Sequence, residues 1–165
     1  MRVEITLDIL VGSIVNQLRE TFGEEDYKYY DKVITEGFEK PSFSVTMINN
    51  ISTRQYAGNE LTLMSDSYRF GIYYFYSADY PNKKEVWDVM DKLKLNFQFL
   101  TIINFLDNDE IRKEQIKVSN LVFQEVDTGV LLCQIELPVK TVILHEVTKV
   151  NSLKNDIINK ESRGN

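Results

Sequence analysis

Residues 61–77, LTLMSDSYRFGIYYFYS, decide the fold class of this chain. One face of the extended chain would carry Tyr68, Phe70, Ile72, Tyr74 and Tyr76. The opposite face would carry Arg69, Gly71, Tyr73 and Phe75. This alternation predicts a long β-strand. Because Tyr73 and Phe75 make the second face apolar as well, we expect either additional helices of the same chain or a neighbouring subunit to cover it.

The residues before this strand predict further extended structure. Residues 29–35 indicate a strand, residues 37–41 a bend, and residues 42–48 a strand with Phe43, Val45 and Met47 on one face. Residues 49–60, NNISTRQYAGNE, are polar and irregular. A connection of this length is often functional or mobile, so we expect it to be a projecting loop. Arg54 and Tyr56 are its candidate contact residues.

Two helices are expected. Residues 6–22 place apolar side chains at helical spacing, with Thr6 able to cap the start and Gly23 the end. The second helix begins near Asn82, whose partner in a capping box would be Glu85. The apolar residues 99–106 fit either a buried strand or an extension of this helix, because periodicity cannot decide between them.

The last part of the chain predicts a closing β-hairpin. Residues 115–126 and 130–139 flank Asp127-Thr128-Gly129, a loop with glycine at the left-handed position. Pro138 indicates that the second strand lies at an edge or ends there. The sequence thus predicts one α+β domain over residues 1–146, with two main helices on one face of a largely antiparallel or mixed sheet. Residues 147–165 would be a polar tail or a short helix, with Leu153, Ile157 and Ile158 at helical spacing as candidate partner contacts.

Composition excludes several functions. The formal net charge of −6 argues against a general nucleic-acid binder and against docking on an anionic membrane. With one cysteine, no intrachain disulfide is possible. The chain lacks a signal peptide at its start and an apolar run that could span a bilayer, so we expect it to fold in a reducing cytoplasm.

A search for catalytic patterns finds little. His145 is the only histidine, so any Ser-His or Cys-His system would depend on it, and Cys133 lies mid-strand, where a small buried side chain is the simpler interpretation. The residues Asp107-Asn108-Asp109 hint at a calcium loop but fail the EF-hand spacing. Walker and G-x-G-x-x-G motifs are absent, and Glu24 and Glu25 are more typical of a solvated helix end. We therefore expect no enzymatic activity, no cofactor and no metal.

Three segments together resemble a known family. They are an N-terminal amphipathic helix, residues 36–45 with the sequence EGFEKPSFSV, and residues 68–75 with the sequence YRFGIYYF. A helix opened by Asn82 and a closing hairpin follow. This order, over roughly residues 5–140, resembles the tail-terminator-like proteins encoded in the tail modules of prophages and of contractile, bacteriocin-like particles of Gram-positive bacteria.

The resemblance implies a structural assembly protein. Such a protein forms a ring, usually hexameric, that caps the head-proximal end of the tail, ends tube growth and meets tube, sheath and collar or neck proteins. It would be made in the host cytoplasm and end in the virion or tail-like particle. Two alternatives stay open, a head–tail connector of the same particle and a small monomeric enzyme or ligand-binding domain. Arg54, Tyr56, Tyr73, Phe75, Leu153, Ile157 and Ile158 are the candidate interface residues.

Overall fold

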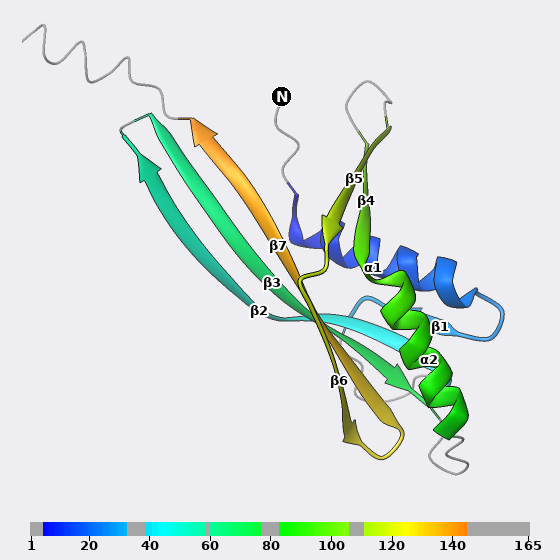
Figure 1. Ribbon diagram of the computed structural model, residues 1–165. Coiled ribbons are helices and arrows are strands. Elements are labelled where there is room, and N and C mark those ends of the chain that lie inside the picture. The colour runs from blue at the N-terminus through cyan, green and yellow to red at the C-terminus, as the bar shows by residue number, and fades with distance from the viewer. Residues whose placement is uncertain (1–4, 33–38, 59, 77–82, 106–110, 145–165) are drawn as a thin grey trace, which may run out of the picture. The chain divides into compact units, whose positions relative to one another are not determined.

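The computed structural model describes residues 5–32, 39–58, 60–76, 83–105 and 111–144. In these residues the elements follow the order α1 (Leu7–Phe22), β1 (Lys28–Tyr30), β2 (Ser42–Ala57), β3 (Leu61–Phe75), α2 (Lys83–Asn96), β4 (Phe99–Phe105), β5 (Ile111–Lys117), β6 (Asn120–Asp127) and β7 (Val130–Leu144) (Figure 1).

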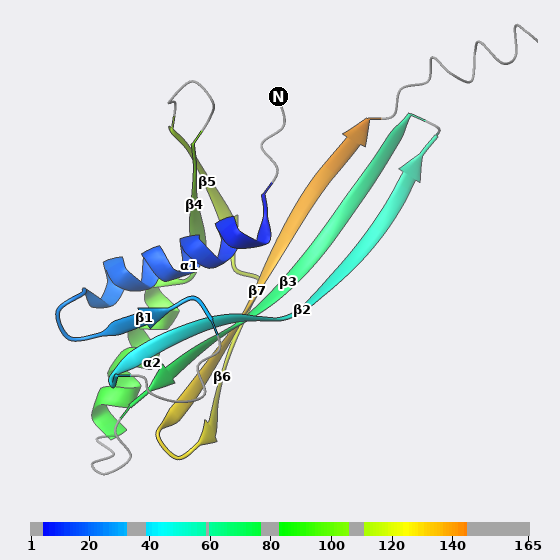
Figure 2. The ribbon, with the colours of Figure 1, turned by 180° about the vertical axis from the view of Figure 1, so that it is seen from behind.

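The strands form a five-stranded sheet of order β1-β2-β3-β7-β6 and a two-stranded sheet of β4 and β5. Strand β1 is parallel to β2, whereas β6 is antiparallel to β7 and β4 to β5. Figures 1 and 2 show β2 and β7 running in one direction and β3, between them, in the other. The predicted α+β class with a largely antiparallel, mixed sheet is confirmed.

The chain divides into two compact units. The larger comprises residues 1–51 and 67–139, and the smaller comprises residues 52–66 and 140–165. Strands β2, β3 and β7 contribute residues to both units, and each unit is considered by itself below.

Helix α1 of the larger unit has the expected boundaries. The Thr6 side chain accepts a hydrogen bond from the Ile9 amide at 3.4 Å, which satisfies one of the unpaired donors at the helix start. At the other end, the Gly23 amide donates to the Arg19 carbonyl at 2.8 Å, and Gly23 has a φ of 82°. Glycine adopts this left-handed backbone without steric cost, so it ends the helix.

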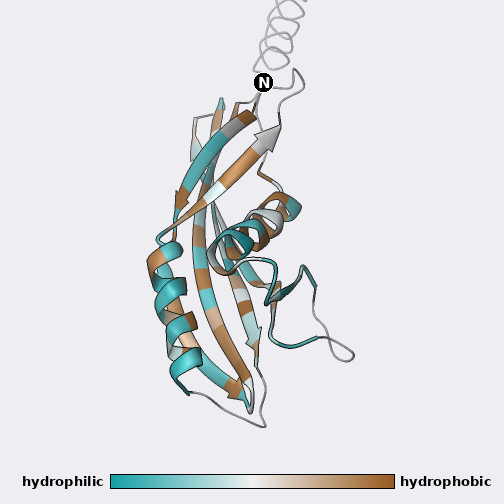
Figure 3. Cartoon of the chain, turned by 90° about the vertical axis from the view of Figure 1, so that its right-hand side faces the viewer, coloured by the Kyte–Doolittle hydropathy of each residue, from teal (hydrophilic) through white to brown (hydrophobic). Residues whose placement is uncertain are grey.

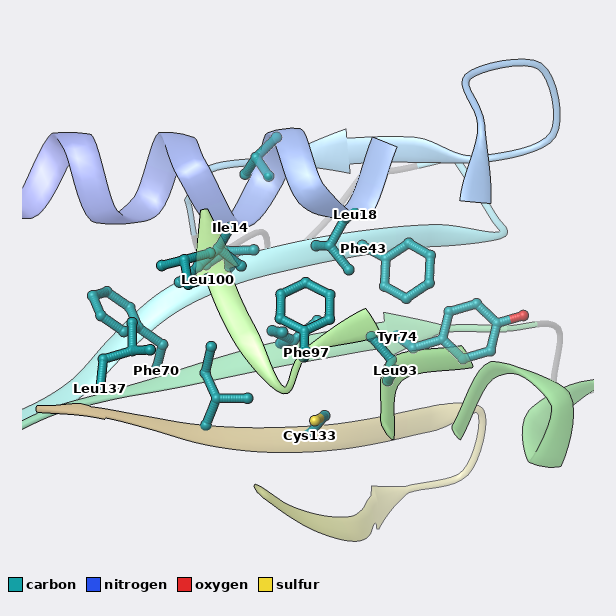
Figure 4. Close-up of a cluster of buried hydrophobic side chains, with 14 of the residues drawn as sticks. Ile14, Leu18, Phe43, Phe70, Tyr74, Leu93, Phe97, Leu100, Cys133 and Leu137 are labelled. Carbon is teal, nitrogen blue, oxygen red and sulfur yellow. The ribbon is translucent and has the colours of Figure 1, made fainter. Parts of the chain in front are cut away.

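Both helices pack on one face of the five-stranded sheet. Figure 4 shows Ile14 and Leu18 of α1 and Leu93 of α2 directed toward Phe43, Phe70 and Tyr74 of the sheet, with Phe97 and Leu100 between them. All of these side chains are buried. Apolar and polar residues alternate along the strands (Figure 3), so the inward face of the sheet matches the predicted pattern.

Residues 99–105 form a strand rather than a continuation of α2. Leu100 and Ile102 of β4 are buried against the helices, and β5 pairs along the whole of β4. The side chain of Gln17 in α1 lies against the backbone of this region. Its amide nitrogen donates to the carbonyls of Asn96 and Phe99 at 2.5 and 2.8 Å, and its oxygen accepts from the Thr101 amide at 3.1 Å. This side chain therefore fixes the two-stranded sheet to α1.

The predicted loop over residues 49–60 is wrong. Strand β2 continues to Ala57 and β3 begins at Leu61, so only residues 58–60 connect the two strands, and Gly58 has a φ of 68°. Every residue of β2 from Met47 to Ala57 is exposed. Neither face of this part of the strand packs on the core, so apolar and polar residues do not alternate along it. Its composition therefore resembles that of a loop, although its backbone is part of the sheet.

Other boundaries differ in smaller ways. The strand predicted over residues 115–126 is two strands, β5 and β6, separated at Val118 and Ser119. Strand β7 continues past Pro138 to Leu144, but its last pairing with β6 is Asn120 with Glu136. Pro138 thus lies where β7 has lost its β6 partner, which agrees with the predicted edge position and not with a strand end. Of the strand predicted over residues 29–35, only the part that belongs to β1 is seen as a strand, and residues 33–35 lie outside the described residues. Asn82 also lies outside them.

Candidate assembly surfaces

The second face of the sheet in the larger unit carries an apolar surface. The Tyr73 and Phe75 rings of β3 stack with centroids 6.4 Å apart, and both residues are half-buried. Ile48 of β2 and Val122 and Val126 of β6 are exposed. Both described helices pack on the opposite face, so in the part of the chain that the structure describes no helix covers these side chains. The sequence predicted this apolar face from Tyr73 and Phe75.

Gly71 lets the side chains of this face pack closely. A Cβ atom there would lie 2.9 Å from Tyr73 Cε2, 3.0 Å from Leu132 Cδ1 and 3.3 Å from Ile48 Cδ1. Three strands therefore meet at this glycine. At the edge of the surface, Glu136 accepts a hydrogen bond from Ser67 Oγ at 2.6 Å and lies 3.6 Å from the Arg69 guanidinium. The surface thus has an apolar centre and a polar edge, an arrangement typical of protein interfaces.

The described part of the smaller unit is a ribbon of three strands, with β3 between β2 and β7. Thr53 Oγ1 donates to the Ser65 carbonyl at 3.3 Å across two of them. Arg54 and Tyr56, which the sequence assigned to a loop, are two residues apart on β2, so they lie on the same face of the ribbon. Tyr56 is 73% exposed and Leu144 of β7 is 75% exposed. Leu144 was missed because the strand was expected to end near Val139.

The remaining predicted contacts, Leu153, Ile157 and Ile158, lie outside the described residues. The same holds for His145 and for Asp107-Asn108-Asp109. Glu24 and Glu25 are exposed, and Glu24 lies 3.6 Å from Arg19. Among the described residues, no group of three or more histidine, cysteine, aspartate or glutamate side chains is placed to hold a metal ion. In the same residues, no helix has the length and apolar character that crossing a membrane requires.

Cys133 is a core residue, as the sequence predicted. It is 1% exposed, and burial raises the pKa of its thiol to about 12. A buried thiol of this kind stays protonated at neutral pH and is a poor nucleophile.

We expect Cys133 in the folded protein to resist alkylation by iodoacetamide at pH 8. A pKa of about 12 leaves about a thousandfold less thiolate than an ordinary cysteine has, and the side chain is covered as well. Mass spectrometry of folded and urea-unfolded protein measures the labelling. Labelling at the same rate in both states would contradict the assigned burial.

A cluster of aromatic rings packs against the five-stranded sheet beside the end of α1. Phe43 is at its centre, with ring centroids of Phe22, Tyr29 and Tyr74 between 4.7 and 5.9 Å away. Burial raises the pKa of Tyr74 and of Tyr29, the latter to about 12. The Tyr29 hydroxyl donates to the Gly23 carbonyl, which ties this cluster to the helix end. These tyrosines are therefore structural groups of the core.

Comparison with known proteins identifies the family. A family model described as phage tail terminator protein matches residues 9–149, which include almost all of the described structure. No curated protein matches the chain. The matched region contains both helices, the five-stranded sheet and the exposed surfaces around Tyr73 and Tyr56. The chain belongs to the phage tail terminator family, and its role is that of a structural protein of a phage tail.

Proposed function

We propose that this protein forms a hexameric ring that caps the head-proximal end of a phage or phage-like tail. The ring ends the growth of the tail tube and contacts tube subunits, sheath subunits in a contractile tail, and neck or collar proteins. It assembles in the bacterial cytoplasm, remains in the particle and acts without enzymatic chemistry. The observation that carries the proposal is the family match over residues 9–149.

Two exposed surfaces support a role in assembly. The sheet face around Tyr73 and Phe75 and the ribbon face with Arg54 and Tyr56 present large side chains outside the core. The apolar sheet face around Tyr73 and Phe75 is of a kind typical of sites that bind other proteins. The net charge of −6 fits protein partners better than nucleic acid.

Tail length is the property that tests this function. Particles produced without the chain are expected to have tails of irregular, extended length, because nothing stops addition of tube subunits. Supplying the wild-type chain restores a uniform length, and supplying a Tyr73→Asp variant restores it poorly, because the new carboxylate must be desolvated at the interface. Electron microscopy of negatively stained particles measures the lengths.

A Glu25→Gln variant is the control, because Glu25 is exposed near the end of α1 and lies on neither surface. It should restore uniform tails as the wild type does. The proposal fails if tails lacking the chain keep a uniform length and an intact end. It also fails if the chain is found dispersed along the particle or off its axis.

A further inference from the structure

Among the described residues of the larger unit, part of one edge of β2 has no partner strand, and this part is called the open β2 edge. Strand β1 pairs with β2 only at Ser42, Phe43 and Ser44. From Val45 to Ile51, no strand in the described ranges lies on that side of β2. The Lys28 amide donates to the Pro41 carbonyl at 3.2 Å, so the Pro41 carbonyl points to the β1 side of β2. Every second residue along a strand directs its backbone groups to the same side. The backbone groups of Met47 and Asn49 therefore point to this open edge.

The β2 edge also lacks the usual protection of an edge strand. Natural edges carry lysine, proline or a bulge that prevents pairing with another chain. Residues 42–53 contain no charged side chain, and Met47 and Ile51 are 39% and 58% exposed. Strand β5, by contrast, carries exposed lysines at Lys113 and Lys117. An unprotected apolar edge of this kind is suited to strand addition.

The other edge of the same sheet has matching properties. Strand β6 is its last strand, and residues 118–124 contain no charged side chain, whereas Glu125 and Asp127 follow at the end of the strand. The side chains of Ile48 and Leu132 meet at Gly71, and Leu132 pairs with Gln124 of β6. One row of neighbouring residues therefore crosses the sheet from Ile48 on β2 to Gln124 on β6. The uncharged parts of the two edges thus lie at the same position along the strand direction.

Strand direction permits the two edges to join. In Figures 1 and 2, β2 and β7 point one way while β3 and β6 point the other. A second copy in the same orientation would place its β2 beside β6 of the first copy, and the two strands would be antiparallel. The alternation of directions would then continue from one subunit into the next.

Each edge is accompanied by a groove on the helix side of the sheet. The groove beside β2 has a volume of about 700 Å³ and is lined by Val11 and Val15 of α1 and by Met47. The groove beside β6 has a volume of about 350 Å³ and is lined by Trp87 and Met90 of α2, among others. The apolar side chains in the two linings would face each other when the edges join.

Each groove contains charged groups of both signs. Asp8 and Asp31 line the groove beside β2, and Lys83 lines the groove beside β6. The grooves also contain Arg19 and Glu125, and each of these has a partner within the subunit. Arg19 lies 3.6 Å from Glu24, and Glu125 accepts a hydrogen bond from the Tyr76 hydroxyl at 3.0 Å. Joining the edges would therefore bring Asp8 and Asp31 of one copy toward Lys83 of the next.

We propose that the open β2 edge of one copy pairs antiparallel with the β6 edge of a second copy of this chain. The contact buries Met47 and Val122 and covers Trp87. It is heterologous, because two different edges meet, and a heterologous contact repeated by rotation generates a ring. The inference deepens the proposed function and rests on it for the ring, whereas the edge contact can be tested on its own.

Met47→Lys and Val122→Lys place a charge on one edge each, and both positions are exposed, so folding tolerates the changes. Each variant alone is expected to associate about 100-fold more weakly than wild type, because the added lysine must be desolvated. An equimolar mixture of the two variants retains one intact β2 edge and one intact β6 edge. The mixture is therefore expected to form a heterodimer of wild-type affinity that grows no further.

Analytical ultracentrifugation measures the association, and the emission of Trp87, the only tryptophan, reports whether its groove is covered. The emission is expected to move to shorter wavelength on association of the wild type and of the mixture. A Gln115→Lys variant, with its new charge on the β5 edge, is the control and should behave as wild type.

Edge pairing is overturned if the wild type stays monomeric at every accessible concentration. It is also overturned if either lysine variant associates as wild type does, or if the mixture gives no heterodimer. These results separate the two proposals. If particles have a ring at the tail end and both lysine variants are incorporated into it, the proposed function stands and the edge contact is rejected. If the mixture forms a heterodimer but particles have no ring, the edge contact stands and the proposed function is rejected.

Discussion

Replacing Phe43 by alanine is expected to lower the free energy of unfolding by about 3–5 kcal/mol, a cost typical of phenylalanine removed from a core. Phe43 is fully buried and lies at the centre of the aromatic cluster, with Phe22 and Tyr74 rings at 4.7 and 4.9 Å. Its removal leaves a cavity that Tyr29 and Tyr74 cannot fill while they stay in contact with their other neighbours. Such a loss is a large fraction of the total stability of about 5–15 kcal/mol that is typical of a folded protein.

Urea denaturation followed by circular dichroism measures this change. Ile51→Ala is the matched control, because Ile51 lies on the same strand and is 58% exposed. The control should change the free energy of unfolding by less than about 1 kcal/mol. A Phe43→Ala protein as stable as this control would show that the aromatic cluster does not hold β2 to the helices.

Alkaline pH is expected to destabilise the protein steeply above pH 10. Burial raises the pKa of Tyr74, and that of Tyr29 to about 12, so both hydroxyls stay neutral in the folded state after they ionise in the unfolded chain. The stabilisation is complete below the unfolded pKa of about 10 and is lost as the pH rises through the folded values. Each proton released only on unfolding contributes a slope of about 1.4 kcal/mol per pH unit.

The Tyr74→Phe variant tests this origin. It keeps the ring in the core and removes the ionisable hydroxyl. The dependence of the free energy of unfolding on pH above pH 10 should therefore become less steep by the contribution of about one proton, which is about 1.4 kcal/mol per pH unit. Urea denaturation at a series of pH values from 8 to about 11 gives the slope. The Tyr56→Phe variant, changed at a position that is 73% exposed, should keep the wild-type slope. An unchanged slope in Tyr74→Phe would assign the alkaline transition to other groups.

The sequence predicted an element most clearly where its residues show the periodic pattern of one buried face. The apolar stripe of α1 and the alternation of Phe70, Ile72 and Tyr74 are direct consequences of one-sided burial, and both predictions are confirmed. The second half of β2 was missed for the opposite reason. Its side chains are exposed on both faces, so pairing of its backbone leaves no trace in the pattern of hydrophobicity.

The candidate surfaces were predicted in part. Tyr73 and Phe75 could be assigned to an outer face because they alternate with core residues on the same strand. The open edges of β2 and β6 could not, because an edge is a property of strand order, and residues far apart in sequence determine that order. The absence of charge over residues 42–53 was a signal in the sequence, but it has meaning only once the strand is known to be outermost.

Gln17 shows why β4 is not a third open edge. An isolated pair of strands is marginally stable in water, and β4 and β5 form such a pair. The carboxamide of Gln17 carries the same donor and acceptor as a peptide unit, and it bonds to the carbonyl of Phe99 and the amide of Thr101 as a neighbouring strand would. A single helix side chain thus imitates one peptide group of an absent strand. The positions it occupies on β4 are closed to an incoming chain, so the backbone pairing proposed above would take place on the five-stranded sheet.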